Sequence, residues 1–302
     1  MDWQCTGLRW PEDSGAPALG WRKGNRTRTS ALAYGTEFGF RASGERHCSG
    51  ARGNACPPAA VVPAGSTGGR CAECGRLDRA HSVAADTIPD DPRPYRVYLA
   101  WFGPGLVKVG ITAEERGAAR LREQGAVVFS WLGRGPLMAA RRAEEVLRAA
   151  LGVPDRIPYA RKRAVRTELP DPAARAAEVT ELYRRVVALE GGGAWPEALE
   201  RLPCAPVDHA GIFGLEAPGG GAGPGPRSVR AVTGLVDGGV VAGRLVAAAG
   251  PDLHLDTGAQ GLLVVDTRLM TGWSLAAAGA GAAGVSPPAV AVGGGGAQDG
   301  LF

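Results

Sequence analysis

The 302-residue chain has no uninterrupted apolar run of about 18 residues, the length a helix needs to cross a bilayer, so we expect no membrane span. Its first residues, MDWQCTGLRW, have neither the basic nor the apolar segment of a secretory signal. A cytoplasmic location is therefore expected, where thiols stay reduced. The six cysteines are then expected to be metal ligands or buried thiols rather than disulfides.

Lysine is scarce: three of the 34 basic residues are Lys, and the others are Arg. The formal net charge is only +4, but charges of one sign are concentrated in parts of the chain. Residues 108–166 carry 13 basic and six acidic side chains, a net charge of +7, whereas residues 202–302 carry a net charge of −3. A basic central segment suits an anionic partner, and DNA or RNA is the first candidate.

Glycine and proline are abundant, with 47 Gly and 23 Pro, roughly double average usage. Much of this share lies in residues 217–226 and in the C-terminal tail, so the folded part is expected to be well below 302 residues. The pattern divides the chain into an N-terminal β-rich segment (1–47), a cysteine-rich zinc-binding region (48–94), an α/β domain with a C-terminal helix (95–191), a Gly/Pro-rich linker (192–227), a small β domain (228–276) and a disordered tail (277–302).

Residues 95–151 have the most regular pattern. Alternating apolar residues predict a strand over 95–102, a turn over 103–105 and a second strand over 106–111. Thr112 followed by Glu115 is typical of a capping box and predicts a helix that ends near Gln124. A third strand over 126–133, a helix from Pro136 to about 151 and a helix over 172–190 follow. With the strands expected near 33–42 and over 228–275, these elements predict an α+β protein whose C-terminal part is a small barrel or sandwich.

Four cysteines lie within 27 residues: Cys48, Cys56, Cys71 and Cys74. The last two form a CxxC motif, whose thiolates can hold one tetrahedral ion from a tight turn. Four thiolates with no vacant ligand position predict a structural zinc ion, which would stabilise a loop-rich segment with little apolar core. His47 and His81 are alternative ligands, and unrelated buried thiols are the alternative to a metal site. We expect no thioredoxin-like redox role, because the CxxC is not predicted to open a helix after a strand.

The first two strands of the α/β domain predict a hairpin with a defined register. A three-residue loop pairs Tyr98 with Gly110 and Ala100 with Lys108, so Tyr98 and Lys108 become diagonal neighbours over small residues. The ammonium group of Lys108 would favour the phenolate, so we expect the pKa of Tyr98 to be lowered.

The helix that begins at Pro136 predicts a buried carboxylate. Glu144 lies in a row of otherwise apolar residues at helical spacing, whereas Glu145 shares its face with two arginines and is expected to be solvated. A carboxylate in an apolar row needs a partner, either an Arg or a metal ion. A structural ion pair and a metal site both remain open for Glu144.

These residues resemble a known superfamily. The motifs RVY at 96–98, KVGIT at 108–112, RL at 120–121 and A-x3-E-x2-L at 140–147 are similar to those of the GIY-YIG nuclease domain, over about residues 95–165. The resemblance implies a small mixed sheet with flanking helices. The whole chain also resembles an uncharacterised bacterial family known only as a domain of unknown function, through its cysteine cluster followed by VYLAWFGPGLVKVGIT, RLREQGA and GPLMAARRAEE.

The resemblance implies a role for each matching residue. Tyr98 would position or activate the attacking water, and Arg120 would steady the scissile phosphate. Glu144 would hold the divalent metal, Mg²⁺ or Mn²⁺, and one carboxylate is sufficient because such an ion keeps several waters. Lys108 stands where the second motif usually has Tyr, which supplies a cation in place of a phenol.

The sequence also departs from the superfamily pattern at several positions. Arg96 replaces the first Gly, Gln124 replaces a His that often follows the Arg, and the late Asn is absent. Arg120 lies two residues further from the second motif than usual, and Arg116 is a rival for its place. These changes weaken the case for catalysis more than the case for the fold.

The sequence therefore predicts a protein that acts on DNA or RNA, with a divalent-metal-dependent endonuclease that hydrolyses phosphodiester bonds as one form of that activity. Two alternatives stay open. One is a zinc-containing nucleic-acid-binding protein without catalysis, and the other is a zinc-stabilised scaffold for protein partners.

Overall fold

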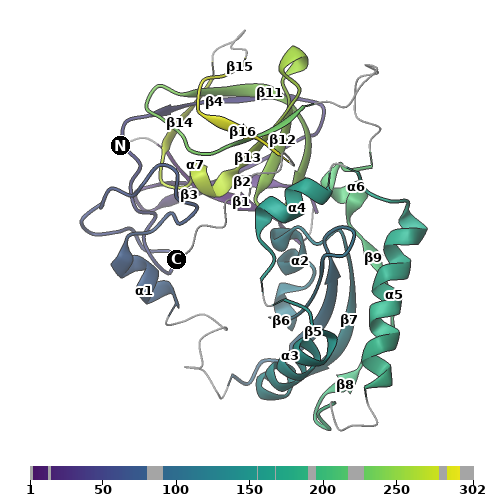
Figure 1. The fold of residues 1–302 in the computed structure, drawn as a ribbon. Coiled ribbons are helices and arrows are strands. Elements are labelled where there is room, and N and C mark those ends of the chain that lie inside the picture. The colour runs from purple at the N-terminus through teal and green to yellow at the C-terminus, as the bar shows by residue number, and fades with distance from the viewer. Residues whose placement is uncertain are drawn as a thin grey trace.

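The computed structural model describes residues 3–12, 15–79, 91–154, 156–166, 168–189, 195–216, 228–278 and 284–292. Two sheets dominate the molecule (Figure 1). The larger has 11 strands and the smaller has five, and the short helices α2 and α4 lie between them. The mixed content agrees with the α+β class predicted from the sequence.

The large sheet is built from both ends of the chain. Its path runs β16-β10-β13-β12-β11-β4-β14-β1-β2-β3, and β15 pairs with β11. The strands are β1 (Gln4–Arg9), β2 (Ala18–Lys23), β3 (Arg26–Ala31), β4 (Glu37–Ser43), β10 (Val229–Val232), β11 (Val240–Ala249), β12 (Asp252–Asp256), β13 (Leu262–Asp266), β14 (Ser274–Ala277), β15 (Gly284–Val285) and β16 (Ala289–Ala291).

This sheet corrects the prediction of two separate β regions. Strand β4 pairs with β11 and β14, so residues 1–47 and 228–276 share one sheet. They also share one core, in which Leu19 and Phe40 pack with Val241, Leu253 and Leu263. The physical reason is size, since about 50 residues alone bury too little apolar surface to be stable.

Two segments expected to be unstructured contain regular elements. The predicted linker holds β8 (Glu200–Arg201), β9 (Val207–Asp208) and α6 (Ala210–Phe213), and both strands pair with β7. The predicted tail contributes β15 and β16 to the large sheet. Residues 192–194, 217–227, 279–283 and 293–302 of these two predictions lie outside the described residues.

The smaller sheet has the order β6-β5-β7-β8, with β9 also on β7. Its strands and helices follow the predicted order of hairpin, helix, strand and helix. They are β5 (Tyr95–Trp101), β6 (Val107–Ala113), α2 (Ala119–Gln124), β7 (Val128–Gly135), α3 (Leu137–Leu151), α4 (Tyr159–Val165) and α5 (Pro172–Ala188). The predicted start of α2 is wrong, because Thr112 is a buried residue of β6 and a short 3-10 turn, Glu114–Arg116, precedes the helix.

The two faces of the small sheet are covered by different helices. Val97, Leu99 and Trp101 pack against α3 and α5, whose apolar residues form one core with them. Tyr98, Ala100 and Phe102 face the other way and pack with Leu121 of α2. This alternation follows directly from the period of two in a strand.

Buried ion pairs join the small sheet's helices to the large sheet. Arg163 on α4 reaches Asp252 and Asp266 of the large sheet at 2.6 Å each, and Arg166 reaches Asp252 at 3.5 Å. Lys162 donates to the backbone oxygen of Gln124, and its burial lowers its pKa to about 7. Part of the basic charge of residues 108–166 is therefore inside the protein and not on its surface.

No helix within the described part of the chain is both long enough and apolar enough to span a bilayer.

Candidate functional site

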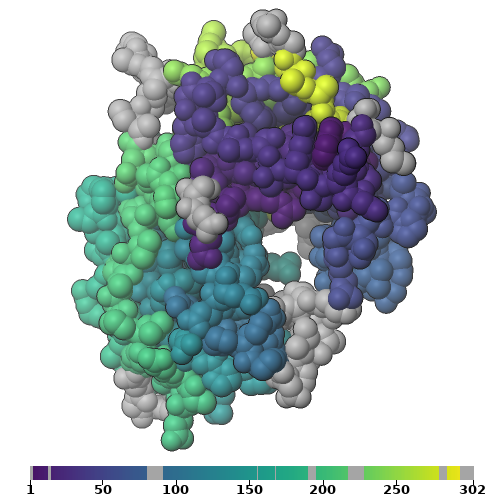
Figure 2. Space-filling view, turned by 180° about the vertical axis from the view of Figure 1, so that it is seen from behind, coloured from purple at the N-terminus to yellow at the C-terminus, as the bar shows by residue number. Residues whose placement is uncertain are grey.

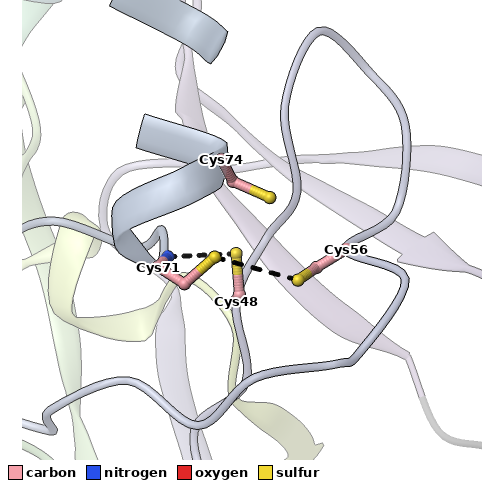
Figure 3. A group of neighbouring side chains, drawn as sticks. All are labelled: Cys48, Cys56, Cys71 and Cys74. Carbon is pink, nitrogen blue, oxygen red and sulfur yellow. Dashed lines mark hydrogen bonds between the residues drawn. The ribbon is translucent and has the colours of Figure 1, made fainter. Parts of the chain in front are cut away.

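The four clustered cysteines meet at one point. Their Sγ atoms all lie within 4.8 Å of one another, and those of Cys56 and Cys71 are 4.0 Å apart. Figure 3 shows the four sulfur atoms pointing toward a common centre, with Cys71 and Cys74 from the start of α1 (Ala72–Arg79) and the other two from loops. Tetrahedral thiolates around zinc are separated by about 3.8 Å, given Zn–S bonds of about 2.3 Å. The four cysteines can thus hold a metal such as zinc.

Backbone amides support these thiols. The Cys48 Sγ accepts hydrogen bonds from the Gly50 N–H at 3.4 Å and the Cys71 N–H at 3.1 Å. Gly50 has a φ of +78°, and a Cβ there would overlap the carbonyl oxygen of Asn54. Only glycine fits this turn without strain.

The start of α1 distinguishes the two thiols of the CxxC. The backbone N–H of Cys74 hydrogen-bonds to the Cys71 sulfur and lowers the pKa of Cys71 to about 7. Burial raises the pKa of Cys74 to about 12, because its thiolate would be poorly solvated and close to the other sulfurs. A cation at the centre would offset this repulsion among thiolates, which is the usual reason that such clusters bind metal.

As predicted, the CxxC does not open a helix after a strand, although α1 itself begins directly after Cys71. The segment before it, residues 62–70, contains no strand, so the strand-to-helix context of a thioredoxin-like motif is absent there. His47 is not in the cluster, and its Nδ1 lies 2.8 Å from the backbone oxygen of Ala59. His81 lies outside the described residues.

The hairpin of β5 and β6 has the predicted register. Tyr98 pairs with Gly110, and Ala100 pairs with Lys108. Gln124, at the end of α2, lies between the two predicted site residues. Its Nε2 donates to the Tyr98 hydroxyl at 2.8 Å, and its Oε1 accepts from the Lys108 Nζ at 3.5 Å. No sequence pattern assigned this role to Gln124, because a Gln cannot exchange protons in place of a His.

The predicted effect on Tyr98 has the wrong sign. Its side chain is only 1% exposed, and burial raises the pKa of the phenol above its ordinary value. The hydrogen bond from Gln124 and the positive charges of Arg120 and Arg116 lower the pKa by less. Tyr98 is therefore a neutral phenol at neutral pH, suited to hydrogen bonding and not to proton abstraction.

The remaining predicted residues surround this hairpin face. Arg120 and Glu144 are close enough for their charges to act on the pKa of Tyr98. Arg120 pairs with Glu123 at 3.6 Å and has a side chain that is 42% exposed. Glu144 is half-buried on α3, in a row whose apolar members are buried, and Glu145 is exposed as predicted. Tyr98, Lys108, Arg120 and Glu144 thus lie in one region of the molecule.

Comparison with known proteins identifies the family but no activity. A family model described as "Protein of unknown function (DUF2797)" matches residues 35–275, about four fifths of the chain. The chain belongs to the DUF2797 family. The match includes the cysteine cluster, the hairpin and α3, while strands β1 to β3 precede it. No curated protein and no solved structure matches the chain.

Within the DUF2797 region, one departure from the GIY-YIG pattern has a structural partner. Arg96, which stands in place of the first Gly, donates to Glu114 at 2.7 Å and lies over the ring of Trp131 at 5.0 Å. Glu114 also accepts from Arg134 at 2.8 Å. Arg96 therefore holds the end of β6 in place, and its positive charge is balanced by the carboxylate.

Proposed function

We propose that the protein acts on nucleic acid, with the hairpin region of the small sheet facing the phosphodiester backbone and a structural zinc ion held by Cys48, Cys56, Cys71 and Cys74. The observation that carries this proposal is the group of side chains around Tyr98. Lys108 is linked to Tyr98 through Gln124, and the charges of Arg116 and Arg120 act on the same phenol. Several cations around one hydrogen-bonding centre suit a phosphate.

The first candidate activity is phosphodiester hydrolysis assisted by Mg²⁺ or Mn²⁺ at Glu144. When bound, such an ion would stabilise the charge that develops on the phosphate. No group of three or more ligand-type side chains includes Glu144 within the part of the chain that the structure describes. One carboxylate holds Mg²⁺ only with help from substrate phosphates, so we expect the ion to bind together with the nucleic acid.

In this proposal each residue acts according to its burial. Tyr98 is a positioning residue that fixes Gln124, because a buried phenol with a raised pKa does not take the proton of water. Lys108 and Arg120 contact the phosphate oxygens as cations. The second candidate function, nucleic-acid binding without hydrolysis, is favoured by the same neutral phenol and by Gln124, neither of which can act as a general base near pH 7.

A nicking assay separates these functions. Purified protein is incubated with supercoiled plasmid or structured RNA and Mg²⁺ or Mn²⁺, and compared with Glu144→Gln and with Glu145→Gln, the exposed neighbour on α3. Hydrolysis predicts nicking by the wild type, at least a 100-fold loss in Glu144→Gln and no loss in Glu145→Gln.

Two other outcomes have clear meanings. A wild type that binds in a salt-sensitive way but never cuts leaves the binding function and rejects the nuclease. A wild type that shows no salt-sensitive binding to either DNA or RNA rejects both and favours a zinc-stabilised protein scaffold.

A further inference from the structure

A half-open cavity of about 630 Å³ lies between the N-terminal strands and the loop that carries the first cysteines. Strands β1 to β3 form one wall, and residues of the cysteine-rich region form the other. Figure 2 shows the N-terminal strands, in purple, over a broad part of the surface with the blue cysteine-rich segment beside them. The lining residues include four arginines and no carboxylate: Arg9, Arg22, Arg28 and Arg70.

The positive charge of this cavity is poorly balanced. Residues 15–36 contain four basic and no acidic side chains. Among the described residues, no carboxylate lies within 4.0 Å of the side-chain nitrogens of Arg9, Arg22 or Arg28. Arg70 is the exception, with Asp78 at 3.2 Å. Like charges that line one cavity repel one another, so an anion in the cavity would be stabilised.

Several contacts hold these cations in place before any ligand arrives. Arg22 donates to the backbone oxygen of Ser49 at 2.6 Å, and Arg70 donates to that of Gly50 at 3.0 Å. Arg28 lies over the ring of Trp3 at 4.3 Å. The Arg9 side chain passes directly over Gly20, and a Cβ on residue 20 would lie only 2.7 Å from the Nε of Arg9. Arginines fixed in this way lose less conformational freedom on binding.

The basic segment 108–166 makes a useful contrast. Arg163 and Arg166 are buried against Asp252, and Arg116 donates to both oxygens of Glu123 at 2.7 Å. Each of these cations already has a carboxylate partner, buried for Arg163 and Arg166 and at the surface for Arg116. The arginines of the N-terminal cavity, by contrast, line a half-open space. The same cavity is lined by threonines whose hydroxyls can donate to phosphate oxygens: Thr6, Thr27 and Thr29.

We propose that this cavity is a second nucleic-acid contact, which binds phosphate groups of a DNA or RNA strand through Arg9, Arg22 and Arg28. The inference rests on the proposed action on nucleic acid and adds a binding surface outside the hairpin region. Because Ser49 and Gly50 directly follow Cys48 and form part of the wall, the shape of the cavity depends on the cysteine cluster. Metal loading should therefore strengthen strand binding.

The test uses the full-length protein and fluorescence anisotropy with labelled single strands and duplexes of about 20 nucleotides, both DNA and RNA. The double variant Arg9→Gln/Arg28→Gln removes two exposed cavity cations. The control, Arg142→Gln/Arg156→Gln, removes the same charge from exposed positions on and after α3. We expect the cavity variant to bind at least 10-fold more weakly at low salt, and its salt dependence to fall by about 1.4 for single strands. Arg28→Lys, which keeps the charge, should retain most of the binding.

The outcomes separate this inference from the proposed function. If the wild type binds and the cavity variant binds equally well, the cavity is not a contact, while action on nucleic acid stands. If the wild type binds neither DNA nor RNA, both are overturned. If inorganic phosphate displaces the labelled strand as effectively as an unlabelled strand at equal phosphate concentration, the cavity takes a small phosphate ligand and the strand proposal is wrong.

Discussion

The guanidinium of Arg163 and the carboxylate of Asp252 meet 2.6 Å apart in the interior and link α4 to the large sheet. The side chain of Asp252 is fully buried, and that of Arg163 is 14% exposed. Arg163 also binds Asp266, which in turn pairs with Arg268. Three arginines, Arg163, Arg166 and Arg268, thus share two buried carboxylates at the boundary between the sheets.

Removing Arg163 should destabilise the protein strongly. Arg163→Met leaves two buried carboxylates with less compensation, which costs about 3–5 kcal/mol of unfolding free energy. Arg184→Met removes an exposed pair with Glu181 on α5 and should cost less than 1 kcal/mol. Urea unfolding measures both. An effect of Arg163→Met as small as that of Arg184→Met would show that the boundary ion pairs add no net stability.

The hydrogen bond between Gln124 and Tyr98 predicts a coupling between these residues. Gln124→Leu leaves the buried phenol without its donor and should cost about 1–3 kcal/mol of unfolding free energy. In Tyr98→Phe the phenol is gone, so adding Gln124→Leu should cost less there than in the wild type. Costs that add within about 0.5 kcal/mol would mean that the contact does not couple the two side chains.

The cysteine cluster predicts about one zinc ion per chain by elemental analysis. Cys71→Ser removes one ligand, so it should lower the zinc content and the solubility of the purified protein, because the loop loses its cross-link. Cys204→Ser is the matched control, since Cys204 lies outside the cluster and is half-buried. Purified wild type without bound zinc would contradict the four-cysteine site.

His209 predicts a loss of stability in acid. It is 1% exposed, and burial lowers its pKa to about 4, below its ordinary value of 6.5. Between pH 6.5 and 4 the unfolded chain binds the proton and the folded chain does not, so stability falls as the pH falls through this window. The loss from this one group amounts to about 3 kcal/mol.

A neutral side chain at this position removes that contribution. His209→Gln should therefore lose less unfolding free energy than the wild type between pH 7 and pH 4.5, as followed by urea titrations. His254 is also buried, with its pKa lowered to about 3, so part of the acid sensitivity should remain. Parallel pH profiles for wild type and His209→Gln would refute the assignment.

Local sequence patterns determined the structural features that depend on residues close together in the chain. The three-residue turn and the alternation of β5 and β6 fixed the register that brings Tyr98 opposite Gly110. Pro172 begins α5 one residue after Asp171, whose side chain accepts from the Ala174 N–H. The spacing of four cysteines indicated a cluster, and the structure brings their sulfurs together.

Only the tertiary structure decided where distant segments meet and which charges remain on the surface. The pairing of β4 with β11 joins residues 199 to 207 positions apart, which no local pattern encodes. The sign of the Tyr98 pKa shift follows from burial under α2, and not from its neighbour on the hairpin. Counting charges along the sequence identified 108–166 as a basic segment. The count could not show that Arg163 and Arg166 are paired with Asp252 inside the protein, because it carries no information on where side chains lie in space. The absence of acidic residues over 15–36 can be read from the sequence. The cavity itself exists because the cysteine-rich loop packs against the strands of this segment, which the tertiary structure alone shows.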